Sequence, residues 1–218
     1  MPDATAPRPS EIPPQQARSR RTRDAIVGAL EELLREGTFQ AASVAEIAER
    51  AGVAVGSVYR RFENKDAMVP ALFDLYFERW EVHRRVLHGD PPELDAGLRS
   101  VLHHAALRAW EFMTREAHIL RAVHLYSRLR PELASVEWHR LRDESRASFR
   151  ALLVHFADEI RHEDLDEAAE VCAYFFNTAF IDRALYPDIG PASGMRLDGE
   201  AFVATMADFA WAWLTMEE

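Results

Sequence analysis

Residues 43–62 read SVAEIAERAGVAVGSVYRRF, and this stretch determines the fold expected for the N-terminal part of the chain. Ser43 and Glu46 have the spacing of a capping box, in which a serine hydroxyl and a glutamate carboxylate each accept a backbone N–H at the start of a helix. Gly52 predicts the end of that helix, because glycine adopts a left-handed conformation at little cost. A second short helix is expected over residues 55–62. Together these features form a helix-turn-helix pattern.

The segments on either side complete this pattern. Residues 22–36 place four apolar side chains on one helical face, at Ile26, Leu30, Leu33 and Leu34. The two helices of residues 43–62 are too short to bury much surface alone, so the preceding helix is expected to complete a three-helix core. Asn64 is expected to cap a long fourth helix that continues toward His88. Pro70 should kink the first turns of that helix or delay its regular part.

The remainder of the chain also reads as helix. Further helices are expected over residues 94–114, 116–129, 131–162, 164–186 and 199–216. No segment shows the alternation of β-branched and polar residues that is typical of a half-buried strand, so an all-α fold is expected. Residues 1–17 hold five of the eleven prolines and almost nothing to bury, which predicts a disordered tail.

Composition and charge narrow the class of protein. The one cysteine, Cys172, excludes a disulfide framework and a multi-cysteine zinc site. The longest charge-free run, residues 171–181, is far shorter than the roughly 20 residues that cross a bilayer. The N-terminus has no apolar stretch typical of a signal peptide, so a cytoplasmic protein is expected. The net charge of −10 is unevenly divided: residues 1–65 hold 10 Lys and Arg against 9 Asp and Glu, and residues 66–218 hold 16 against 27. Only the N-terminal part has a charge compatible with phosphate binding.

An ordered set of short motifs surrounds the helix-turn-helix pattern. It consists of a leading basic helix, Ser43-Val44-x-x-Ile47-Ala48, Ala51-Gly52-Val53, Gly56-Ser57-Val58-Tyr59, Phe62 and Asn64-Lys65-Asp66. From about Arg20 to Leu75 the chain resembles the N-terminal DNA-binding domain of the tetracycline-repressor (TetR-like) family of bacterial transcriptional regulators. The resemblance covers about a quarter of the chain.

The resemblance implies roles for individual residues. Ser43 and Lys65 would contact phosphates of double-stranded operator DNA. Five residues of the second short helix would face the major groove or its rim: Val55, Gly56, Ser57, Tyr59 and Arg60. Short side chains there allow close approach, and hydroxyl groups position the DNA backbone. Ala54 departs from the family pattern, in which a serine or threonine often caps this helix.

The resemblance also implies an organisation for the whole chain. A disordered tail (1–17) would precede a helix-turn-helix DNA-binding domain (18–65) and a larger helical regulatory and dimerisation domain (66–218). The protein would be a repressor that a small-molecule ligand releases from a palindromic operator. Surplus apolar residues on 164–186 and 199–216 predict that these helices form a homodimer interface. The candidate pocket for an apolar or aromatic effector comprises Trp80, Trp110, Phe112, Met113, His118, Tyr126, Trp138 and Tyr174.

Other interpretations stay open at the level of sequence. His155, Glu159 and His162 have helical spacing and the residue types of a metal site, although a water-exposed polar shoulder beside an apolar face explains them better; no metal and no cofactor are assigned. Cys172 has apolar neighbours, and no nucleotide or hydrolase fingerprint is present, so we expect no enzymatic activity. A helical enzyme would need turnover of a compound. A helical adaptor or ligand-binding protein that no longer binds DNA is the alternative, which salt-dependent DNA binding would exclude.

Overall fold

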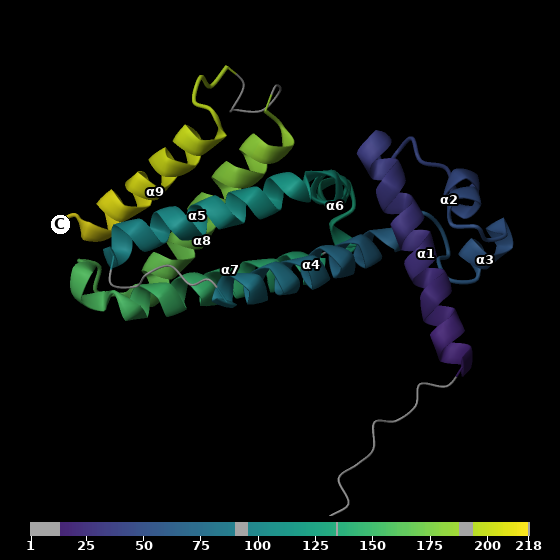
Figure 1. The fold of residues 1–218 in the computed structure, drawn as a ribbon, viewed down its shortest axis with the longest axis horizontal. Helices are drawn as coiled ribbons and strands as arrows, with labels where there is room; N and C mark the ends of the chain where they lie inside the picture. Colours follow the sequence, from purple (N-terminus) through teal and green to yellow (C-terminus); the bar gives the residue numbers. More distant parts are fainter. Residues whose placement is uncertain (1–13, 90–95, 134, 188–193, 218) are drawn as a thin grey trace, which may run out of the picture. The chain divides into compact units, whose positions relative to one another are not determined.

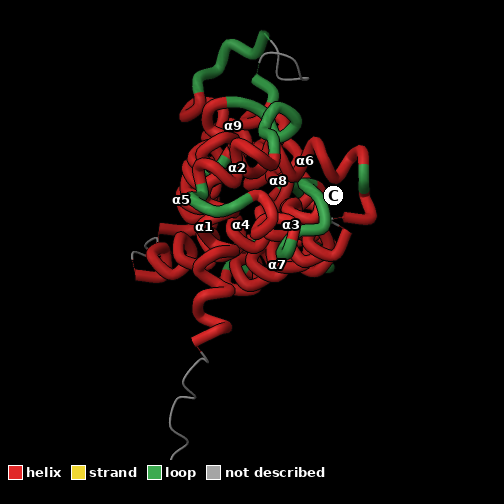
Figure 2. Tube along the Cα trace, turned by 90° about the vertical axis from the view of Figure 1, so that its right-hand side faces the viewer, coloured by secondary structure: helices red, strands yellow, loops and turns green. Residues whose placement is uncertain are grey.

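The computed structural model describes residues 14–89, 96–133, 135–187 and 194–217. Every regular element in these residues is a helix, and Figure 2 shows helices and connecting loops alone. The predicted all-α fold is confirmed. The chain divides into two compact units, an N-terminal unit (Met1–Met68) and a C-terminal unit (Val69–Glu218). None of the described helices has the length and apolar composition needed to cross a membrane.

The N-terminal unit is a small three-helix structure. Its helices are α1 (Pro14–Glu36), α2 (Val44–Arg50) and α3 (Val55–Tyr59), and a 3-10 turn (Asp66–Met68) ends the unit. Figure 1 shows α2 and α3 beside α1. Apolar side chains from all three helices and from the loop after α1 are buried in this unit, among them Ile26, Leu30, Phe39, Ile47 and Val58. The expected three-helix core is present.

Local interactions explain the bounds of α2. The hydroxyl of Ser43 accepts the N–H of Glu46 at 3.2 Å, and the Glu46 carboxylate accepts the N–H of Ser43 at 2.8 Å. These hydrogen bonds lower the pKa of Glu46, because they stabilise its charged form. Gly52 follows the helix with φ of 65°. Ala54, at the N-cap of α3, makes no side-chain capping bond, as the sequence predicted.

Two predicted boundaries in this unit are wrong. Helix α1 begins at Pro14, so residues 14–17 belong to a helix and not to the tail; proline suits the first position because no intrahelical bond needs its missing N–H. The rest of the predicted tail, residues 1–13, lies outside the described residues. Helix α3 ends at Tyr59 and not at Phe62. The chain there turns so that Phe62, only 7% exposed, enters the core.

The long helix α4 (Val69–Gly89) starts after a delay. The Asn64 side chain accepts the N–H of Ala67 at 3.0 Å, so it caps the turn before α4 and not α4 itself. A 3-10 turn over Asp66–Met68 then precedes α4, and Pro70 is the second residue of the helix. A proline in a first turn removes no intrahelical hydrogen bond, so the helix continues beyond it without a break.

The C-terminal unit contains the remaining helices. They are α4, α5 (Gly97–Arg115), α6 (Ala117–Leu129), α7 (Ser135–His155), α8 (Leu165–Leu185) and α9 (Gly199–Thr215). Helix α5 packs on α9 and on α8, α7 packs on α8, and α4 packs on α6 (Figure 1). Cys172 lies in the core shared by α5, α7, α8 and α9. Burial raises the pKa of its thiol to about 12, so Cys172 is a protonated packing residue at neutral pH.

His155, Glu159 and His162 do not form the helical stripe that their spacing predicted, because α7 ends at His155 and not at residue 162. Glu159 instead accepts the N–H of Leu98 through both carboxylate oxygens, at 3.2 Å each. The Nε2 atom of His162 lies 2.9 Å from the carbonyl oxygen of Trp213. These side chains therefore stabilise the start of α5 and the end of α9.

The positive φ of Gly52 generates a stability prediction. A Cβ atom at Gly52 would meet no neighbour, so Gly52→Ala should destabilise the protein through backbone strain alone, by about 1 kcal/mol. Gly28, inside α1, also has open space around its Cβ position, and Gly28→Ala should stabilise the protein by about 0.5–1 kcal/mol. Urea unfolding of both variants measures the two shifts. Shifts of the same sign would contradict the assigned role of the left-handed turn.

Candidate functional site

Helix α3 has one buried and one exposed side. Val58 is fully buried, whereas Val55 is 42% exposed and Tyr59 is 53% exposed. Gly56 and Arg60 are also exposed, and Ser57 is half-buried. Because the buried side packs in the core, the predicted recognition residues are presented together on the opposite side of a rigid support.

Two successive arginines after α3 have different roles. Arg60 lies at the surface, where its Nη2 donates to the hydroxyl of Ser57 at 2.7 Å. Arg61 reaches α1, where its Nη1 donates to the hydroxyl of Ser19 at 2.8 Å. Arg60 therefore retains further N–H donors beside Tyr59, whereas Arg61 connects the segment after α3 to α1.

Ser43 keeps a free donor. Its hydroxyl oxygen accepts the N–H of Glu46, and its own N–H is bound by the Glu46 carboxylate. A serine hydroxyl can accept one hydrogen bond and still donate another. Ser43 is exposed at the start of α2, so the predicted phosphate contact is compatible with the capping box.

Lys65 is engaged differently from the prediction. Its Nζ donates to the carbonyl oxygens of Phe39 (2.8 Å), Gln40 (3.1 Å) and Ala42 (2.9 Å), and it lies 4.9 Å from the centre of the Phe39 ring. An ammonium group has three donors, and all three are used within the protein. Burial lowers the pKa of Lys65. Lys65 therefore stabilises the loop between α1 and α2, and the predicted contact with phosphate would require these bonds to break.

A bidentate ion pair orients α2, and the sequence pattern did not predict it. The Arg50 guanidinium donates two hydrogen bonds to the Glu36 carboxylate, at 2.7 and 3.0 Å, between the ends of α2 and α1. This bidentate pair lowers the pKa of Glu36. The two residues are 14 positions apart in an exposed region, so no helical spacing indicates their contact.

The segment that contains α2 and α3 is similar to a known protein family. Residues 26–72, which include α2, α3, the C-terminal part of α1 and the start of α4, match the family model described as bacterial regulatory proteins, tetR family. This segment is TetR-like. The TetR-like segment contains the whole exposed side of α3 and all of the helix-turn-helix.

Solved structures of TetR-family proteins share the fold of most of the chain. A Mesorhizobium loti protein assigned to the TetR family is 17% identical, with a TM-score of 0.65 over 89% of this chain and 95% of that one. The TetR family regulator PfmR from Thermus thermophilus is 19% identical, with a TM-score of 0.59 over 87% and 98%. GusR from Salmonella enterica is 18% identical, with a TM-score of 0.56 over 95% and 100%. At these identities the likeness concerns the fold. No curated protein matches the chain.

The C-terminal unit contains two adjoining cavities. One is apolar, has a volume of about 150 Å³, and lies between α4, α5, α7 and α8. The other is a polar cleft of about 770 Å³ between α6, α7 and α8. Leu141 and Asn177 line both. Leu141 and Asn177 therefore lie at the boundary between the two cavities.

The predicted pocket residues are distributed unevenly. Trp80 and Met113 line the apolar cavity, and Trp138 and Tyr174 line the polar cleft. The other four, Trp110, Phe112, His118 and Tyr126, line neither cavity. Phe112 is fully buried, and Trp110 packs between the rings of Phe180 and Phe202. For these two residues, the aromatic character that suggested a pocket reflects core packing.

Several lining residues were missed by the sequence analysis. The most informative is Asn177, because it is the one amide in the charge-free run of residues 171–181. A polar side chain in the middle of an apolar helix needs a buried partner. That requirement was the available signal for a site on α8.

Side-chain hydrogen bonds connect the residues along one wall of the polar cleft. The Trp138 indole donates to the hydroxyl of Ser127 at 2.6 Å, and the Ser127 hydroxyl donates to the His124 carbonyl at 3.2 Å. The Nδ1 atom of His124 lies 2.9 Å from the Tyr186 hydroxyl. Burial, followed by the charge of Arg128, lowers the pKa of His124, so its ring is neutral at pH 7.

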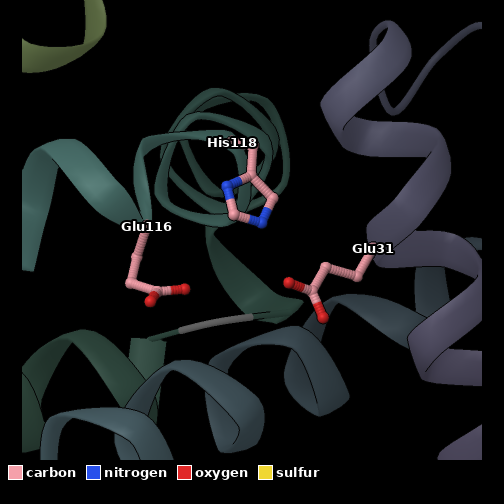
Figure 3. Close-up of side chains that lie close together, drawn as sticks. All are labelled: Glu31, Glu116 and His118. Atoms are coloured by element: carbon pink, nitrogen blue, oxygen red, sulfur yellow. The ribbon is translucent and has the colours of Figure 1, made fainter.

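The corner between α5 and α6 carries a buried carboxylate. Figure 3 shows Glu116 and His118 extending from this corner. The Glu116 carboxylate accepts hydrogen bonds from Nη1 of Arg79 on α4, at 2.6 Å, and from Nε of Arg115, at 3.1 Å. This pairing offsets the free-energy cost of burying the charge of Glu116. Glu31, also drawn in Figure 3, belongs to α1 and pairs with Arg35 within the N-terminal unit. Glu116 thus connects α4 to the start of α6.

The bonds of Lys65 generate a prediction. Lys65→Met should destabilise the N-terminal unit by about 2 kcal/mol, because three carbonyl groups lose a charged donor. Hydrogen exchange should increase in residues 38–43. Arg60→Met is the matched control; it removes an exposed cation that makes one side-chain bond and should change stability by less than about 0.5 kcal/mol. Equal stability of the two variants would show that Lys65 does not hold the loop.

Proposed function

We propose that the chain is a sequence-specific transcriptional regulator: a homodimeric repressor that binds operator DNA through α3 and is released by a small-molecule ligand. The observation that carries the proposal is the exposed side of α3, with Val55, Gly56, Tyr59 and Arg60 on a helix whose other side is buried. Its position within the segment that matches the tetR family supports the assignment. A regulator of bacterial DNA acts in the cytoplasm.

Each exposed group suits a different part of DNA. The Tyr59 hydroxyl and the Arg60 guanidinium are donors that suit phosphate oxygens, and the Ser43 hydroxyl is a third donor at the start of α2. Gly56 and the small side chain of Val55 allow the backbone of α3 to approach base edges closely. Ser57, half-buried and bonded to Arg60, orients that guanidinium from within the protein. These properties support major-groove binding by α3.

Dimerisation is the second part of the proposal. One short recognition helix reads few base pairs, and a two-fold dimer reads two half-sites about 34 Å apart. Val171 and Tyr174 of α8 are 40% and 73% exposed, and Phe209 of α9 is 61% exposed. Helices α8 and α9 are in contact with each other. Their exposed apolar groups support a four-helix interface across a two-fold axis.

Release by a ligand is the third part. Tyr76 and Trp80 of α4 line the apolar cavity, and α4 begins directly after the last residue of the N-terminal unit. A ligand that occupies the cavity changes the packing of α4, and it lowers DNA affinity only if it binds the DNA-free conformation more tightly.

DNA binding is tested by fluorescence anisotropy with the DNA that flanks the gene, in the presence of unrelated competitor DNA. We expect binding that survives the competitor and weakens steeply between about 50 and 200 mM salt. Tyr59→Ala should lower operator affinity roughly tenfold to a hundredfold, with circular dichroism unchanged because Tyr59 is exposed. Tyr59→Phe, which keeps the ring, should have an intermediate effect. Wild-type affinity in Tyr59→Ala would refute α3 as the recognition helix.

The dimer interface is tested by a charge on α9. Phe209→Glu should raise the dimer dissociation constant at least about 30-fold, because two carboxylates would enter an apolar contact. Val154→Glu is the control, since Val154 is an exposed apolar residue on α7. Sedimentation velocity measures both. Dissociation by Val154→Glu with an intact Phe209→Glu dimer would place the interface elsewhere.

A further inference from the structure

The apolar cavity owes its volume to small residues on α5. Ala105, Ala106 and Ala109 follow one another along one face of this helix and line the cavity, opposite aromatic rings such as Phe149 and Phe176. Larger side chains at the alanine positions would fill the space. An apolar cavity of about 150 Å³ holds one benzene-sized ring.

The side chains with polar atoms that line this cavity are Tyr76 and Trp80 on α4, Glu144, Ser145 and Ser148 on α7, and Asn177 on α8. The Asn177 side chain donates from Nδ2 to the Ser145 hydroxyl at 3.0 Å, which leaves its carbonyl oxygen to accept. Glu144 also lines the cavity, and its charge is already paired with Arg140 at 2.8 Å. At Asn177 and Glu144 a ligand therefore meets an amide oxygen that can accept a hydrogen bond and a carboxylate that is already paired with a cation.

The charge of the cavity excludes an anionic ligand group. Its described lining includes no lysine, arginine or histidine. A carboxylate or phosphate in this space would lose its hydration without a compensating cation, and it would face the Glu144 carboxylate. The arginines near the site, Arg128, Arg142 and Arg146, line the polar cleft instead.

We propose that the apolar cavity binds a neutral six-membered ring with one hydroxyl donor, a phenol-type group, and that this hydroxyl donates to the side-chain oxygen of Asn177. The inference rests on the proposed function in that it treats this ring as part of the effector. Asn177 lines both spaces, so the ring binds with its hydroxyl toward the polar cleft. Asn177 is the residue that determines specificity, and the alanines of α5 determine the size of the ring.

Isothermal titration calorimetry of the full chain, without DNA, tests the inference with three probes: phenol, toluene and benzoate. Phenol and toluene have nearly the same size and differ in the donor. Phenol should bind about tenfold more tightly than toluene, because toluene leaves the Asn177 oxygen without a donor. Benzoate should bind at least about tenfold more weakly than phenol. Equal affinity for phenol and toluene, tighter binding of benzoate, or no binding of phenol would overturn the inference.

Three variants separate the hydrogen bond from the volume. Asn177→Leu should remove the preference for phenol over toluene. Thr178→Val, the matched control, changes a neighbour on α8 that lines only the polar cleft, and it should keep the preference. Ala109→Leu should weaken both ring probes at least about tenfold by filling the cavity. Circular dichroism establishes that each variant is folded. A preference for phenol that persists in Asn177→Leu would refute the role of Asn177.

The calorimetry tests the ring site independently of the DNA-binding assay. Asn177-dependent phenol binding in a chain that binds no operator would leave the ring site valid and refute the proposed regulator. Operator binding in a chain without a preference for phenol would refute the ring site and leave the regulator in place.

Discussion

The burial of one side of α3 is the constraint on which the proposed recognition surface depends. A helix of five residues has almost no stability of its own. Val58 and Phe62 provide that stability because both are buried in the N-terminal unit. Gly52 allows the sharp turn that brings α3 onto the core. The exposed residues of α3 are therefore held in place by residues that pack in the core of the N-terminal unit.

Polar contacts stabilise the loop and the helix ends that the small apolar core does not reach. The ammonium group of Lys65 holds three carbonyl groups of the loop after α1, and Arg50 pairs with Glu36 at the ends of α2 and α1. In the C-terminal unit, Arg79 and Glu116 connect α4 to the α5–α6 corner in the same way. Lys65 satisfies backbone carbonyl groups of a loop, whereas Arg50 and Arg79 each pair with a carboxylate on another element.

The two cavities divide the C-terminal unit into parts with different chemistry. Aromatic packing closes the core around Phe112 and around Trp110. The alanines of α5 leave space between the same helices, and Asn177 marks the boundary of this space with the polar cleft. Because α4 contributes one wall, occupancy of the cavity and the packing of α4 depend on each other.

The sequence by itself determined the helix-turn-helix, its capping box, the glycine turn, the uncapped Ala54 and the all-α class, because each depends on residues a few positions apart. Only the tertiary structure decided that Lys65 binds the loop after α1 and that the His155, Glu159 and His162 stripe is interrupted. It also decided which aromatic residues line a cavity and which fill the core. These features depend on side chains that are distant in sequence and meet only when helices pack, and helical periodicity carries no information about such contacts.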